Sequence, residues 1–111
     1  MAETLKRLGA TEVVANTDTE LYGPGATTTG VVSTIAVCNK GATNRTFRLA
    51  HVDGAAIAGV AAEDYFAYDH TILANSSQFF QLGVTFSGND TILVRASHAD
   101  VVFIAWGSEI A

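Results

Sequence analysis

Cysteine, proline and charge are all scarce in this 111-residue chain, and each scarcity limits what the protein can be. The one cysteine, Cys38, excludes an intrachain disulfide, so stability must come from packing or from assembly. The one proline, Pro24, predicts the end of a strand, because proline cannot donate a hydrogen bond to a neighbouring strand. No apolar run approaches the ~18 residues of a membrane-spanning helix, and residues 1–10 contain no apolar signal core. We expect no membrane partner and a protein that is made soluble in the cytoplasm.

Charged residues make up 15% of the chain, whereas about 25% is usual in a soluble domain. Hydrophobic residues make up 49%, so the chain is poor in the solubilising surface that a free monomer needs. The net charge is −5 and the six basic residues are scattered, which argues against nucleic acid as a partner. This composition favours a subunit that hides part of its surface in an assembly.

The hydrophobic pattern has the two-residue period of strands, and turn residues recur about every 8–12 residues. The length fits one domain. We therefore predict an all-β fold over residues 11–111, an antiparallel β-sandwich resembling a jelly roll, with about seven to eight strands.

Two of the expected strands are apolar on both faces. In residues 101–106, Val101, Phe103 and Ala105 alternate with three other apolar residues, Val102, Ile104 and Trp106. In residues 31–39, alternation places Val31, Ile35 and Val37 on one side and Val32, Thr34, Ala36 and Cys38 on the other. One face of a strand fills the core of a sandwich, so the second apolar face predicts a second partner. Cys38, in the middle of the second strand, is expected to be buried and unreactive.

Residues that carry chemistry do not form a recognisable motif. Histidine and aspartate lie close in sequence at three places, His51-x-Asp53, His98-x-Asp100 and Asp69-His70, but each pair falls at an expected turn and supplies too few ligands for a metal. Glu63 and Asp64 are adjacent and point to opposite faces of a strand, so they cannot flank one glycosidic bond. We expect no enzyme, and no catalytic, cofactor or metal site.

Aromatic residues leave an alternative open. Six of them fit either a sugar-binding platform or a core and interface: Tyr65, Phe66, Tyr68, Phe79, Phe80 and Trp106. A carbohydrate-binding module is therefore an alternative to an assembly subunit.

The N-terminal segment, residues 1–10, is predicted to be an attachment arm outside the sandwich. It contains the only adjacent basic pair, Lys6 and Arg7, flanked by Leu5 and Leu8. These four residues are the expected partner-binding set, and Trp106 is the next candidate.

Several strand-and-turn motifs resemble those of small all-β virion proteins of tailed bacteriophages. They are ILAN at residues 72–75, LGVTF at 82–86, GNDT at 88–91, VRAS at 94–97 and GSEI at 107–110, together with VSTIAVCN at 32–39 and TFR at 46–48. The resemblance implies a structural protein of the virion: a capsid decoration (cement) protein, or alternatively a tail or fibre component. It also implies a homotrimer that binds the major capsid protein or other virion proteins, with no cofactor.

Overall fold

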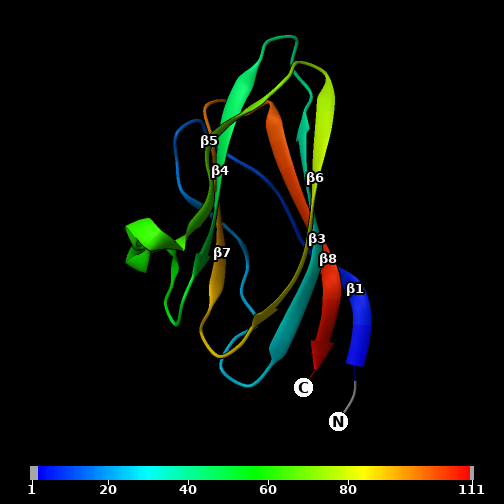
Figure 1. The fold of residues 1–111 in the computed structure, drawn as a ribbon, viewed down its shortest axis with the longest axis vertical. Helices are drawn as coiled ribbons and strands as arrows, with labels where there is room; N and C mark the ends of the chain where they lie inside the picture. The colour runs from blue at the N-terminus through cyan, green and yellow to red at the C-terminus, as the bar shows by residue number, and fades with distance from the viewer. Residues whose placement is uncertain (1–2, 111) are drawn as a thin grey trace.

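The computed structural model describes residues 3–110, which form two antiparallel sheets packed face to face (Figure 1). Sheet A has the strand order β1-β8-β3-β6 and sheet B the order β2-β7-β4-β5. The strands are β1 (Glu3–Glu12), β2 (Thr19–Tyr22), β3 (Thr29–Asn39), β4 (Arg45–Val52), β5 (Tyr65–Ile72), β6 (Ser76–Phe86), β7 (Thr91–Ala96) and β8 (Val101–Ile110). Most consecutive strands change sheets, which is the jelly-roll arrangement. The predicted β-sandwich is confirmed.

The core lies between the two sheets and is built from alternate residues of the strands. Phe47 and Leu49 of β4 point into it, and they meet Phe103 of β8 and Ile35 of β3. The Phe47 and Phe103 rings pack edge to face with centroids 6.3 Å apart. Burial of this one set of side chains fixes which face of each strand points outward.

A bulge in β3 changes the assignment of its faces. The register of β3 against both neighbours shifts between Val32 and Thr34, so one extra residue is accommodated there. Val32 therefore joins Ile35 and Val37 in the core, and Val31 lies on the outer side. The simple alternation over residues 31–39 was wrong for the part of the strand before the bulge.

Residues 3–10 belong to the sandwich, contrary to the expectation of a separate arm over residues 1–10. They form most of strand β1, which pairs with β8 from Glu3 to Glu12. The pairing with β8 continues through the whole segment, and Leu8 packs against the core. Residues 1 and 2 lie outside the described part of the chain.

Part of the outer face of sheet B is covered by the chain itself. Two 3₁₀ turns, η1 (Ile57–Gly59) and η2 (Ala62–Asp64), stand against this face, drawn green in Figure 1. A second cluster of buried residues, Ala50, Val52 and Leu93, packs against Ala55, Ile57, Val60 and Tyr65 of this segment. The second apolar face of β4 and β7 thus has an intramolecular partner. No helix within residues 3–110 is long and apolar enough to cross a membrane.

Candidate interaction surface on sheet A

The outer face of sheet A carries almost no charge. Strands β3 and β6 contain no charged residue, and the one charged residue of β8, Glu109, turns to the other side to meet Tyr22 of sheet B. Within residues 4–110, charged side chains reach this face along the edge strand β1, at Arg7 and Glu12. No part of residues 3–110 covers the face, whereas sheet B has its 3₁₀ turns (Figure 1).

Apolar side chains fill the centre of this face. Val102, Ile104 and Trp106 of β8 point outward and are half-buried by their neighbours. The surrounding strands add Leu5, Val31, Ala36 and Phe79. Leu5 on β1 is 81% exposed and Phe79 on β6 is 63% exposed, so the patch extends to both edge strands of the sheet. Single exposed apolar residues are ordinary, but a contiguous apolar patch of this kind marks interaction sites.

A hollow of about 470 Å³ lies at one end of this face. Its walls come from three strands: Leu5, Lys6 and Arg7 of β1, Val31 and Ser33 of β3, and Trp106, Gly107 and Ser108 of β8. The bulges of β1 and β3 lie beside it, so irregular pairing produces the depression. The hollow brings Trp106 together with part of the predicted N-terminal set.

The predicted partner-binding residues do not all share this face. Leu5, Arg7 and Trp106 lie on it, but Leu8 packs against the core. The Lys6 ammonium lies 2.7 Å from Glu109, so its charge is already paired within the chain. The expectation that Lys6 and Leu8 bind a partner has no support in this geometry, because both side chains are used to hold β1 in place.

Glu109 is the centre of a polar cluster that ties β1, β8 and β2 together. Besides the Lys6 ammonium, it accepts a hydrogen bond of 2.7 Å from the Tyr22 hydroxyl. The hydrogen bond from Lys6, followed by that from Tyr22, lowers the pKa of Glu109 below its usual value. Burial of the phenol, together with the bond to Glu109, raises the pKa of Tyr22. This clasp of three side chains holds β1, β8 and β2 together, and the charges of Lys6 and Glu109 compensate each other within it.

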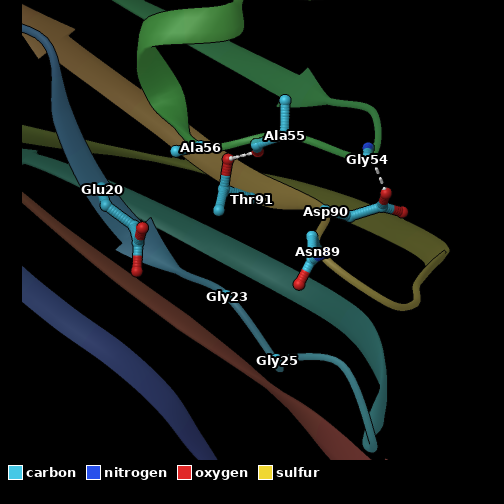
Figure 2. Close-up of a pocket in the computed structure, with 9 residues that line it drawn as sticks. All are labelled: Glu20, Gly23, Gly25, Gly54, Ala55, Ala56, Asn89, Asp90 and Thr91. Carbon is cyan, nitrogen blue, oxygen red and sulfur yellow. Dashed lines mark hydrogen bonds between the residues drawn. The ribbon is translucent and has the colours of Figure 1, made fainter.

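A second pocket, of about 410 Å³, lies where loops meet at one end of the sandwich (Figure 2). It is lined by Glu20, Gly23, Gly25, Gly54, Ala55, Ala56, Asn89, Asp90 and Thr91. Asp90 points toward the backbone of Gly54 and accepts its N–H, and the Thr91 hydroxyl donates to the Ala55 carbonyl. These side chains close the turns around the pocket.

Asp90 is held as a carboxylate by its surroundings. Burial by itself would raise the pKa of Asp90, but hydrogen bonds from the Gly54 amide, from His51 and from the Ser87 amide together keep the pKa below its usual value. His51 lies 3.1 Å from Asp90 and stacks on Phe86 with ring centroids 3.9 Å apart. The pair anchors the 87–90 turn to β4.

The histidine and aspartate pairs of the sequence are mostly separated by the fold. His51 contacts Asp90 instead of Asp53, and Asp69 contacts Arg48 instead of His70. Only His98 and Asp100 contact each other, at 3.2 Å. No group of three or more metal-ligating side chains is found among the described residues.

The aromatic residues are divided between two surfaces. Tyr65 and Tyr68 pack edge to face on β5 at 5.0 Å, and the Arg48 guanidinium lies 4.1 Å from the centre of the Tyr68 ring. Phe79 and Trp106 lie on the outer face of sheet A, while Phe80 packs against the core. One platform containing all six is therefore not formed.

Cys38 is on the outer face of sheet A, where it is half-buried. The expectation of a buried thiol was wrong, because Val37 next to it takes the core position. Its neighbours across the sheet are Val102 on β8 and Ser77 on β6.

No family model matches the chain, and no curated protein matches it. Among solved structures it is similar to a chain in the structure of the infectious bursal disease virus Gx strain, with a TM-score of 0.48 and 10% sequence identity. The match covers 97% of this chain and 30% of that chain, so this protein spans less than a third of its length.

Proposed function

We propose that this protein is a structural component of a virus particle and that it binds neighbouring subunits through the outer face of sheet A. The observation that carries the proposal is that the outer surface of β8, β3 and β6 is free of charge, has an apolar centre, and is covered by no part of residues 3–110. The jelly roll is a fold of viral capsid domains, and of lectins as well, so the fold is compatible with the role without deciding it. The resemblance to tailed-phage virion proteins supports the finer role of a capsid decoration protein.

The proposed mechanism is stabilisation by burial. Each Å² of apolar surface removed from water contributes roughly 25 cal/mol, and a virus particle repeats the contact over many copies. Ile104 lies at the centre of the face, between Ala10 on β1 and Ala36 on β3. A charged side chain at position 104 would lose its hydration on binding, and this cost would weaken the contact.

The experiment that tests this proposal is incorporation of an Ile104→Lys variant into particles. Val14→Lys is the matched control, because Val14 is also an apolar residue on the surface but lies in the connection from β1 to β2. We expect wild-type and Val14→Lys protein to purify with particles, and Ile104→Lys protein to remain free although folded. Incorporation of Ile104→Lys at the wild-type level contradicts the proposal.

A second candidate function is carbohydrate binding on sheet B. The observation in its favour is the exposed ring of Tyr68, which is oriented by Arg48 beneath it and packs against Tyr65. Titration of soluble glycans into wild-type and Tyr68→Ala protein tests it. Saturable binding that Tyr68→Ala abolishes would favour this function, and no binding by the wild-type protein would remove it.

A further inference from the structure

The outer face of sheet A has a pattern that is complementary to itself. Strand pairing aligns its residues in rows that run across the sheet. The middle row is Ala10, Ile104, Ala36 and Phe79. The row on one side is Arg7, Trp106, Thr34 and Gln81, and the row on the other side is Glu12, Val102, Cys38 and Ser77.

Two charges of the face, those of Arg7 and Glu12, are placed symmetrically and have opposite sign. Arg7 and Glu12 both lie on β1, one in each outer row, and both are exposed. A rotation of the molecule by 180° about an axis that lies over the middle row and runs parallel to it exchanges the positions of the two outer rows. That operation places Arg7 of each copy opposite Glu12 of the other.

We propose that two copies of this chain pack face to face through sheet A, related by a two-fold axis that runs across the strands over the middle row. This inference rests on the proposed role of the face as an interaction surface and names its occupant. The interface is isologous, so each contact occurs twice. Trp106 packs against Val102 of the second copy, and Ile104 packs near the axis against the same row.

The apolar residues also suit such a pair in shape. The large Trp106 side chain faces the smaller Val102, and near the axis the small side chains of Ala10 and Ala36 flank Ile104. Alternation of large and small side chains lets two sheets interdigitate at the usual spacing of about 10 Å. The Arg7 and Glu12 pairs lie at the edge of the interface, where charge fixes the register more than the affinity.

The size of the face is sufficient for a pair. With about 3.3 Å per residue and about 4.8 Å between strands, ten residues on four strands cover about 600 Å². Two such faces remove about 1,200 Å² from water, which reaches the lower end of stable interfaces. In a trimer around one axis, only part of each flat face would contact a neighbour. The symmetric placement of Arg7 and Glu12 would then not pair opposite charges between copies.

Charge reversal tests the arrangement. Arg7→Glu alone places two acidic side chains opposite each other in both pairs, and Glu12→Arg alone does the same with two basic ones. A mixture of the two variants restores opposite charges in both pairs, as does the double variant Arg7→Glu/Glu12→Arg. Asp53→Arg serves as the control, because Asp53 is an exposed acid in the turn after β4.

The readout is the mass in solution, measured by analytical ultracentrifugation at tens of micromolar protein. We expect twice 11.6 kDa for wild type and Asp53→Arg, and 11.6 kDa for each single variant. Twice that mass returns in the mixture and in the double variant. Circular dichroism checks that each variant is folded, and the double variant gives the answer if a single variant does not fold.

Three results would overturn the proposal: a monomeric wild-type protein, a mass of three chains, or single variants that pair as well as wild type. These results do not decide the proposed function, because the particle assay with Ile104→Lys is independent. A wild-type monomer that still loses incorporation with Ile104→Lys contradicts the pairing alone. A wild-type pair in which Ile104→Lys is incorporated normally contradicts the virion role alone.

Discussion

Replacing Tyr22 by phenylalanine removes a single hydroxyl group from the clasp that joins β2 to sheet A. The hydroxyl donates a 2.7 Å hydrogen bond to Glu109, and the Tyr22 side chain is 6% exposed. Hydrogen bonds to a charged group contribute about 1.5–3 kcal/mol. Since Glu109 keeps its contact with Lys6 and is partly open to solvent, the lower part of this range applies.

We expect Tyr22→Phe to lower the free energy of unfolding by about 1.5–2 kcal/mol. At about 4 °C per kcal/mol for a domain of this size, the melting temperature should fall by about 6–8 °C. Urea unfolding followed by circular dichroism measures the first quantity, and a thermal scan measures the second. Tyr68→Phe is the matched control, because the Tyr68 side chain is 59% exposed and its ring would still lie over Arg48.

The same substitution should change the titration of Glu109. Loss of one of its two hydrogen-bond donors moves the pKa of Glu109 upward, toward its usual value, and NMR titration of the carboxyl carbon follows that shift. The reasoning is refuted if Tyr22→Phe unfolds within about 0.5 kcal/mol of wild type, which is the range of ordinary surface substitutions. An unchanged Glu109 pKa in the variant would also contradict it.

Two further predictions concern packing and pH. Gly107→Ala should lower the free energy of unfolding in urea by about 1–3 kcal/mol, because a Cβ at Gly107 would collide with the Val31 carbonyl; wild-type stability in this variant would refute the close approach of β8 to β3. The pKa values of Asp90 and Glu109 in the folded state are below their usual values, so the unfolded chain binds more protons than the folded chain in acid. The stability that these carboxylates contribute should therefore be fully present at neutral pH and be lost as the pH falls through their folded-state pKa values. In urea titrations from pH 7 downward, Asp90→Asn should weaken this loss, and an equally steep loss in the variant would contradict the role of Asp90.

Strand periodicity predicted the fold because the core depends on alternation alone. The alternation of β8 correctly separated Val101, Phe103 and Ala105, which the structure buries, from the outward set of the same strand. The β3 bulge was not predictable in this way, because a bulge adds one residue without a distinctive side chain at Ser33. It reversed the assignment of Val31.

The candidate surface was only partly predictable. The outward set Val102, Ile104 and Trp106 follows from the alternation of β8, and the absence of charge in β3 and β6 is visible in the sequence. The contacts of Lys6 and Leu8 could not be predicted, because their partners, Glu109 and the core, come from distant parts of the chain. The cover over sheet B was also missed, since the small residues of the 55–62 segment have no clear period.

If the outer face of sheet A is covered by protein in the assembled state, Cys38 should be protected there, because it lies on that face. It is the only cysteine, it is half-buried, and it lies in an outer row beside Val102. The measurement is the rate of alkylation of Cys38, followed by mass spectrometry of its peptide, in concentrated wild-type protein and in the Ile104→Lys variant. We expect slow labelling in the wild-type assembly and rapid labelling in the folded variant. Equal, rapid labelling of both would contradict it.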